Sequence, residues 1–359
     1  MRSTRTVFSL GAIVVHLFAQ LTTASGDGDQ AIQIQTIAKQ LLSIIGRRSD
    51  SGIDLSAPIQ SAVRDAGEAT SNHDDAASPQ LKALRWLLKD RENPEASTTE
   101  GRGLPTDADF EILQKYALAV FYFSTNGDGW KTCSQVANTP CEDDAPAQSS
   151  TGRFLSHNLP ACFWNGLTCA DQSRKGHVSW IDLSRNNLVG SIPDELSLLS
   201  DDLELLWLSG NDGLVGSIPE WIGNFSHLQN LSLFETSLGG NLPPSLYTLE
   251  KLTALRLYGS KFKGTIATEI GELKELAWLW IHGNEFSGSL PSEIGHLKNI
   301  AGLTVHRNRF EPQGGGGAAN ILPQEVCNMR TENKILENLW MDCDTNRSCQ
   351  CCSRCFEPH

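Results

Sequence analysis

The sequence lacks the short motifs that carry common enzymatic chemistry. It contains no G-x-S-x-G nucleophile motif, no H-E-x-x-H zinc motif and no glycine-rich phosphate loop with its lysine. Acidic pairs such as Asp201-Asp202 fall on predicted turns and serve a glycosidase only when they flank a cleft. Nothing in the sequence places them across one. We therefore expect a binding role, with no catalytic residue, cofactor or metal.

Positive charge is also scarce. The chain has 29 Lys and Arg against 42 Asp and Glu, a formal net charge of −13 at pH 7. Nucleic acids and anionic membrane surfaces are bound by clustered Lys and Arg side chains. The charge balance therefore argues against nucleic acid as a partner, and it carries no information about the fold.

Long apolar runs are absent except near the N-terminus. Arg2 and Arg5 precede the apolar run 7–21, and small residues follow it up to Ala24. This order is typical of a secretory signal peptide cleaved after Ala24. The alternative, a signal anchor retained in the membrane, needs ~20 apolar residues, and this run is shorter. The C-terminus also lacks the hydrophobic tail of a lipid anchor, so we expect a secreted protein with no membrane span after signal cleavage.

Cysteine is missing before residue 133 and from the whole stretch between Cys169 and Cys327. An even number of cysteines in a secreted chain indicates disulfides. The six C-terminal cysteines allow fifteen pairings, and the sequence does not choose among them. An oxidising compartment disfavours the redox or zinc alternative for the C-x-x-C at Cys352. The ten cysteines are Cys133, Cys141, Cys162, Cys169, Cys327, Cys343, Cys349, Cys351, Cys352 and Cys355.

A repeat fills the region without cysteine. The framework L-x-x-L-x-L-x-x-N-x-L-x-G-x-I-P occurs six times with a spacing of 24 or 25 residues. One copy cannot bury its own leucines, but stacked copies share a continuous core. The L-x-L part predicts a short strand with inward leucines, and the Asn position predicts a ladder of hydrogen bonds to the backbone. The copies begin at Val178, Leu203, Leu228, Leu252, Leu276 and Ile300.

These motifs resemble a known family. The G-x-I-P element and the C-x-W-x-G-x-x-C block from Cys162 to Cys169 resemble plant-type leucine-rich-repeat (LRR) proteins. Residues 116–130 and the tail from Leu322 to Cys355 are similar to extracellular repeat proteins of diatoms and related algae. The resemblance implies an α/β fold, a right-handed solenoid with a parallel concave sheet and disulfide-bonded caps. It also implies a Cys162–Cys169 bridge, which leaves Cys133 to pair with Cys141, and a receptor-like or secreted recognition protein.

Five segments follow from these patterns. Apolar residues at helical spacing begin at Ile34, at Leu81 after Ser78-Pro79, and at Phe110. We expect the last two helices to cover the first coil of the solenoid. A membrane-binding role for residues 32–45 is the alternative to a packed or pro-segment helix. The segments are a signal peptide (1–24), a helical and partly disordered region (25–105), an N-terminal cap (106–177), six repeats (178–310), and a glycine-rich insertion (residues 314–317) with a cysteine-rich cap (311–359).

The candidate ligand surface lies on the predicted concave face. Side chains alternate along a strand, so residues between and after the inward leucines face solvent. Aromatic rings at this density indicate an interface, because Trp and Tyr anchor ligands and stack on sugars, and Arg256 is suited to a carboxylate or sulfate. The alternative is that the rings merely pack on one another. The predicted site consists of Trp207, Phe234, Tyr258, Arg256, Trp278, Trp280, His282 and His306.

The partners expected for this surface are an extracellular protein, peptide or polysaccharide, with a membrane co-receptor as a further partner. An inhibitor of a secreted hydrolase and a structural protein of the cell wall or matrix are the alternatives. Two histidines one repeat apart, His282 and His306, form a weak metal or pH-sensing pair without a third ligand. Three N-x-S sequons, at Asn224, Asn230 and Asn346, are candidate glycosylation sites. A glycan at Asn230 would obstruct the predicted surface.

Overall fold

The computed structural model describes residues 28–47, 59–61, 77–92, 108–132, 152–157, 159–169, 176–200, 202–311, 322–332, 335–343, 349 and 351–356. Several predictions fall elsewhere in the chain. The signal peptide of residues 1–24, the pair Cys133 and Cys141, the glycines 314–317 and the sequon at Asn346 lie outside the described residues. The chain divides into two compact units, Met1–Thr98 and Thr99–His359.

The first unit contains two of the predicted helices, α2 (Gly28–Arg47) and α4 (Pro79–Glu92), which pack on each other. The Ser78 hydroxyl accepts a hydrogen bond from the Leu81 N–H at 3.3 Å, which confirms the predicted cap. The apolar face of α2 is buried, with Leu41 fully inaccessible to solvent. The membrane-binding alternative for residues 32–45 is therefore not supported, because a helix that binds a membrane surface needs its apolar face free.

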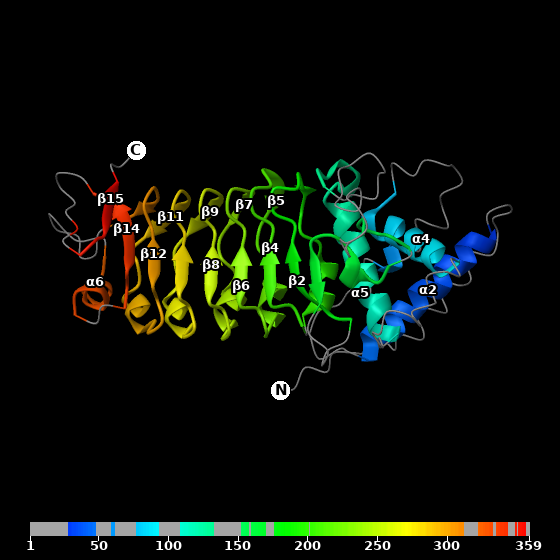
Figure 1. Cartoon of the computed structure of the whole chain (residues 1–359), viewed down its shortest axis with the longest axis horizontal. Coiled ribbons are helices and arrows are strands. Elements are labelled where there is room, and N and C mark those ends of the chain that lie inside the picture. The colour runs from blue at the N-terminus through cyan, green and yellow to red at the C-terminus, as the bar shows by residue number, and fades with distance from the viewer. Residues whose placement is uncertain are drawn as a thin grey trace, which may run out of the picture. The chain divides into compact units, whose positions relative to one another are not determined.

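The second unit is a solenoid built on a nine-stranded sheet (Figure 1). Its strands follow one another in chain order, and all neighbours pair in parallel except β1 and β2, which are antiparallel. We call the solvent side of this sheet, which is the predicted concave face, the sheet face. The strands are β1 (Leu167–Cys169), β2 (Val178–Asp182), β4 (Leu205–Trp207), β6 (Asn230–Ser232), β8 (Ala254–Arg256), β10 (Trp278–Trp280), β12 (Gly302–Thr304), β14 (Asn338–Asp342) and β15 (Arg354–Phe356).

The leucine core is confirmed by the register of these strands. Leu206, Leu231, Leu255 and Leu279 are directly paired from strand to strand, and each is at most 1% exposed. The column continues through Leu303 to positions beyond the six predicted copies. One coil therefore buries its leucines only against the coils on either side, as the repeat predicts.

The back of each coil turns through a second strand and a short 3₁₀ helix. The proline of the G-x-I-P element precedes most of these 3₁₀ helices, for example Pro219 before Glu220–Asn224 and Pro291 before Ser292–His296. The second strands form a six-stranded parallel sheet on a different side of the solenoid. They are β3 (Val189–Gly190), β5 (Gly213–Gly216), β7 (Ser237–Gly240), β9 (Lys261–Gly264), β11 (Glu285–Gly288) and β13 (Arg309–Phe310).

The asparagine ladder is present, and it is weakest where the sequence replaces asparagine. Asn211 donates to the carbonyls of Leu183 and Leu208 at 3.0 and 2.7 Å and accepts from two backbone N–H groups. The Ser260 hydroxyl donates to one carbonyl, that of Leu233, at 3.1 Å and accepts the Thr236 N–H at 3.2 Å. A hydroxyl carries one donor where an amide carries two, so this coil holds its neighbour with fewer bonds.

Restoring the ladder at this position is expected to stabilise the protein. In Ser260→Asn, the side chain gains a second donor and can bond to the carbonyls of Leu233 and Leu257, which are equivalent to those that Asn284 and Asn308 bind in the later coils. We expect an increase of about 1 kcal/mol in the free energy of unfolding, measured by urea denaturation. Ser289→Asn, on an exposed position, is the control and should change little. An unchanged or lower stability of Ser260→Asn would contradict the interpretation of the ladder.

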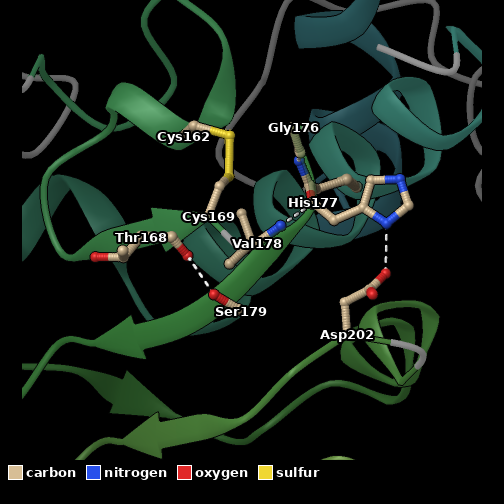
Figure 2. The surroundings of a disulfide bond; sticks show 9 residues. Cys162, Thr168, Cys169, Gly176, His177, Val178, Ser179 and Asp202 are labelled. Atoms are coloured by element: carbon tan, nitrogen blue, oxygen red, sulfur yellow. Dashed lines mark hydrogen bonds and ion pairs between the residues drawn. A yellow bond between two sulfur atoms is a disulfide. The ribbon is translucent and has the colours of Figure 1, made fainter. Parts of the chain in front are cut away.

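The N-terminal end of the core is covered by helix α5 (Ala108–Ser124) and by β1. Helix α5 packs on the 3₁₀ helix Asp194–Leu199 of the first coil, and Gln114 bonds to Gly176 and Val178 at the start of β2. The predicted cover is therefore confirmed for this helix, whereas for α4, which belongs to the first unit, it stays a prediction. Figure 2 shows the Cys162–Cys169 disulfide beside the hydrogen bond from Ser179 to the Thr168 carbonyl, and the contact of His177 Nδ1 with the Asp202 carboxylate.

The C-terminal end is covered by helix α6 (Gln324–Thr331), which packs on the 3₁₀ helix Ser292–His296, and by the two last strands of the large sheet. Three disulfides link this cap: Cys327–Cys351, Cys343–Cys355 and Cys349–Cys352. They select one of the fifteen pairings that the sequence left open. Cys343–Cys355 joins the end of β14 to β15 and so holds β15 in the sheet.

Candidate ligand-binding surface

The predicted site residues come from five consecutive strands, β4 to β12, and the residues just after them. Trp207 ends β4, Arg256 ends β8 and Trp280 ends β10, and the strand register aligns these positions in one row across the sheet face. Trp278 belongs to the neighbouring row, two residues earlier on β10. The remaining rings, Phe234, Tyr258, His282 and His306, follow their strands by two residues and form a third row.

This third row is a continuous stack of aromatic rings. The centroids of Phe234 and Tyr258 are 4.2 Å apart, those of Tyr258 and His282 4.6 Å, and those of His282 and His306 4.4 Å. Phe356 of β15 extends the stack with its centroid 3.9 Å from that of His306. The planes of neighbours differ by 5° to 12°. We call these five rings the ring ladder; their faces cover one another, and every ring except the buried His306 is partly exposed.

A second cluster lies beside the ladder around Arg256. Its Nη1 donates to the Asn230 Oδ1 at 2.5 Å, and the same oxygen accepts the Trp207 Nε1–H at 3.0 Å. The guanidinium lies over the Trp280 ring, 5.1 Å from its centroid. Trp278 meets Trp280 edge to face at 5.7 Å. The cluster is a fixed arrangement of three indoles and one cation, held by the Asn230 amide, which the predicted site did not include.

Gly302 on β12 explains how Trp278 packs. A Cβ at this glycine would lie 2.6 Å from the Trp278 ring and 3.2 Å from the Trp280 Nε1. Trp278 therefore lies over the backbone of the next strand, where any larger residue would displace it.

Two expectations about exposure were wrong. Ser209, Ser232 and Thr304, predicted to face solvent, are buried, because the larger rings beside them close over short side chains. His306 is only 4% exposed, since it lies between His282 and Phe356 in the ring ladder. The alternative that the rings pack on one another is thus correct for their faces. Phe234, Tyr258 and His282 keep partly exposed edges.

Sequence reasoning missed the C-terminal part of this surface. Trp340 of β14 occupies the row of Arg256 and Trp280, and Arg354 of β15 lies over both Trp340 and Phe356, at 5.5 and 4.7 Å from the ring centroids. The position of Trp340 could have been predicted from the sequence, since Leu336-x-x-Leu339-x-Met341 repeats the strand framework. Phe356 and Arg354 had none, because no repeat surrounds them.

The two histidines of the ring ladder are uncharged near neutral pH. Burial, followed by the charge of Arg307, lowers the pKa of His282 to about 4. The pKa of His306 is also lowered to about 4, by burial first and then by His282, Arg307 and Arg354. His282 Nδ1 bonds to the Thr304 hydroxyl at 2.7 Å, whereas His306 Nδ1 is buried without a hydrogen-bond partner among the described residues. A charge on either ring is therefore poorly solvated.

These pKa values predict that the protein loses stability in mild acid. The unfolded chain binds protons at the ordinary histidine pKa of 6.5, above the folded value of about 4. The two neutral histidines therefore make their full contribution to the free energy of unfolding above pH 6.5, and this contribution is lost as the pH falls towards 4. Each ring changes the free energy of unfolding by at most about 1.4 kcal/mol per pH unit. Urea denaturation across this range should show a smaller slope in His282→Phe and His306→Phe, whereas His296→Asn, on an exposed residue, should keep the original slope. An equal slope in a double Phe variant would contradict the assignment.

The described sequons differ in setting. Asn224 ends a 3₁₀ helix on the back of the coil. Asn230 lies on the sheet face, where its Oδ1 accepts from Trp207 and Arg256, and the hydroxyl of its sequon partner Ser232 bonds to Ser209 at 2.9 Å. Use of either site for glycosylation stays a prediction, and the candidate surface requires an unmodified Asn230.

Two further features are absent from the described part of the chain. No helix in it is long and apolar enough to cross a membrane. No group of three or more His, Cys, Asp or Glu side chains there is placed to hold a metal ion. The paired histidines His282 and His306 are therefore without a third protein ligand of these types within the described residues.

Comparisons with known proteins agree with the coils described above. The family model for the Leucine Rich Repeat matches residues 177–199 and 275–297. The protein MALE DISCOVERER 2 of Arabidopsis thaliana is 44% identical over 68 residues, which are 19% of this chain and 9% of that protein. The chain thus spans under a tenth of this relative's length.

Three solved structures show the same kind of likeness over about half of this chain. The ectodomain of the receptor kinase HAESA from Arabidopsis, solved with an IDA peptide hormone, has 29% identity, a TM-score of 0.45, and coverage of 55% of this chain and 30% of its own. The ectodomain of GASSHO1/SCHENGEN3 from Arabidopsis, in complex with CASPARIAN STRIP INTEGRITY FACTOR 2, is 29% identical with a TM-score of 0.43. The match covers 52% of this chain and 20% of that ectodomain. A plant ice-binding protein is 25% identical with a TM-score of 0.45, and the match covers 54% of this chain and 57% of that protein. The family model thus identifies residues 177–199 and 275–297 as leucine-rich repeats, and the paired leucines of the nine-stranded sheet connect the coils that contain them.

Proposed function

We propose that this chain is an extracellular recognition protein whose sheet face binds a peptide or an extended segment of a protein. The observation that carries the proposal is the ring ladder with the Arg256 cluster beside it. Together they place partly exposed aromatic edges and a fixed cation in adjacent rows. Aromatic and arginine side chains are the usual energetic centres of protein interfaces. The role is one of binding, without catalysis.

The geometry favours a peptide over a polysaccharide. A sugar stacks on the open face of an aromatic ring, but within the ladder each inner ring is covered on both faces. One face of Trp280 lies against the Arg256 guanidinium. Ring edges and indole or phenol groups instead suit backbone carbonyls and side chains of an extended chain. A sheet of parallel strands also repeats equivalent side-chain positions every ~4.8 Å, so an extended chain that crosses the strands meets the row on each of them in turn.

An extracellular setting fits the disulfides. Four bridges are present among the described residues, and disulfides persist mainly in oxidising compartments. The proposal therefore includes secretion, a receptor-like role, and a membrane co-receptor as a second partner. The likeness of residues 116–130 and of the C-terminal cap to extracellular proteins of diatoms and related algae stays a prediction from the sequence.

The test uses peptides selected for binding to the folded chain from a random peptide display library. For such a peptide, Tyr258→Ala and Trp280→Ala should each weaken binding by about 30-fold or more, because each removes a central aromatic contact of ~2 kcal/mol or more. Affinities are measured by isothermal titration calorimetry. Lys263→Ala, an exposed position on the six-stranded sheet, should bind with the original affinity.

The proposal fails if correctly folded Tyr258→Ala and Trp280→Ala variants bind every selected peptide as tightly as the original chain. A pull-down from the extracellular fraction of the source then separates the alternatives. Recovery of one secreted hydrolase would favour an inhibitor, and recovery of bulk polysaccharide would favour a structural role in the wall or matrix.

A further inference from the structure

The cations of the sheet face are concentrated at its C-terminal half. Arg256, Arg307 and Arg354 lie along the ring ladder, and none of them makes an ion pair with another described residue. The charges of Arg307 and Arg354 lower the pKa of His306, which places both guanidinium groups near the ladder. The whole chain carries a net charge of −13, so a local group of unpaired cations departs from the general character of the surface.

Arg256 is the most constrained of the three. Its side chain is half-buried, and burial lowers its pKa. Its partner Asn230 is neutral and takes one bond from Nη1, while Trp280 covers one face of the guanidinium. A guanidinium has five N–H donors, arranged so that two can bind one carboxylate side by side. The remaining donors of Arg256 are therefore oriented before any ligand arrives, and the charge is partly desolvated without a counter-ion.

Arg354 is held in a comparable way at the other end. It lies over the rings of Trp340 and Phe356. The strand that carries it, β15, is fixed to the sheet by the Cys343–Cys355 disulfide and by pairing with β14. The terminal cap thus contributes to the sheet face as well as closing the core.

Two carboxylates near the ladder take part in other interactions. Asp342, which pairs with Phe356 in the register of β14 and β15, accepts the backbone N–H of Arg307 at 2.6 Å. Glu235 lies 3.9 Å from Arg185, at the other end of the ladder. The edges of the ladder rings carry partial positive charge as well. The C-terminal half of the sheet face is therefore complementary to an anionic chain.

Building on the proposed function, we infer that the ligand is an acidic peptide in extended conformation, whose carboxylates bind Arg256, Arg307 and Arg354 while its backbone crosses the edges of the ring ladder. The surface then extends beyond the six repeats onto β14 and β15. Trp340 and Phe356 are specificity-determining residues in this arrangement, because they hold Arg354 in place.

The experiment uses defined probes: a fluorescein-labelled synthetic peptide of alternating glutamate and alanine, and its matched peptide with glutamine for glutamate. Fluorescence anisotropy with the full chain should give at least about tenfold tighter binding of the glutamate peptide. Arg256→Gln, Arg307→Gln and Arg354→Gln should each weaken its binding by about five- to tenfold and reduce the dependence of affinity on salt. The matched control is Arg309→Gln, which removes an arginine that pairs with Glu285 at 3.3 Å on the six-stranded sheet.

Three results would overturn this inference. The first is equal binding of the two peptides, and the second is equal binding by the arginine variants and the control. The third is arginine-dependent binding of polygalacturonate, a polysaccharide with comparable carboxylates, without binding of the glutamate peptide. The peptides selected in the preceding section keep the proposed function separate, because their dependence on Tyr258 and Trp280 does not require any acidic residue in the ligand. Circular dichroism confirms that each variant is folded.

Discussion

Asn211→Ala is expected to lower the free energy of unfolding by about 3 to 5 kcal/mol. The side chain is buried inside the turn that follows β4, and its amide donates to the carbonyls of Leu183 and Leu208. Its oxygen accepts the N–H groups of Asn186 and Leu188 from the preceding coil. Alanine removes all four bonds at once, and each buried group left without a partner costs roughly 1 to 3 kcal/mol.

Urea denaturation followed by circular dichroism measures this loss. Asn299→Ala is the matched control, because this asparagine is exposed and bonds mainly to the carbonyl of Lys274 and the carboxylate of Glu275. Its loss should stay within about 0.5 kcal/mol. A loss below about 1 kcal/mol for Asn211→Ala would show that water replaces the amide, and the ladder would then not be what couples the first coil to the second.

The repeat region was predictable because one physical requirement recurs in every copy. Leu231 and Leu255 align because each coil must bury its leucines on its neighbours, and the Asn position recurs because each turn leaves the same carbonyls unpaired. Such constraints appear in the sequence at a fixed period. The antiparallel strand β1 and the terminal strand β15 occur once each, so no period marks them.

The candidate surface was predictable only in part. Alternation along the strands placed Tyr258 and Trp280 on the sheet face, and the register confirms that position. Their ligand contacts stay a prediction. The alternation of side chains did not predict that the rings cover one another's faces. It also did not predict that small residues such as Ser232 are buried beneath the rings. Both features depend on the side-chain rotamers of neighbouring coils. Asn230 was considered only as a sequon, whereas its amide organises the cation beside it.

Removal of the Cys162–Cys169 disulfide, by Ser at both positions, is expected to cost about 2 to 3 kcal/mol. The bridge joins the 3₁₀ helix Ala161–Phe163 to β1, which pairs with β2 and covers the first edge of the nine-stranded sheet. It closes a short loop, for which the loss of chain entropy in the unfolded state predicts an effect of this size. Trp164, between the two cysteines, is fully buried and packs on Phe154, 5.1 Å between ring centroids, so freeing this segment also loosens the aromatic cover of the cap.

The location of the destabilised strands in the double Ser variant distinguishes a disulfide that holds only the cap from one that stabilises the whole solenoid. An open solenoid exposes its core only at its ends, and each coil contacts mainly its neighbours, so a defect at one end should spread only a few coils. Hydrogen exchange in the double Ser variant should therefore accelerate in β1 and β2 and leave β10 and β12 as slow as in the original chain. The bond between the Asp182 N–H and the Gly166 carbonyl, at 2.8 Å, lies in the expected zone of faster exchange. Uniform acceleration through β12 would mean that the coils unfold as one cooperative body, and the disulfide would then stabilise the whole sheet, including the ring ladder, which begins at Phe234 beside the third strand after β1.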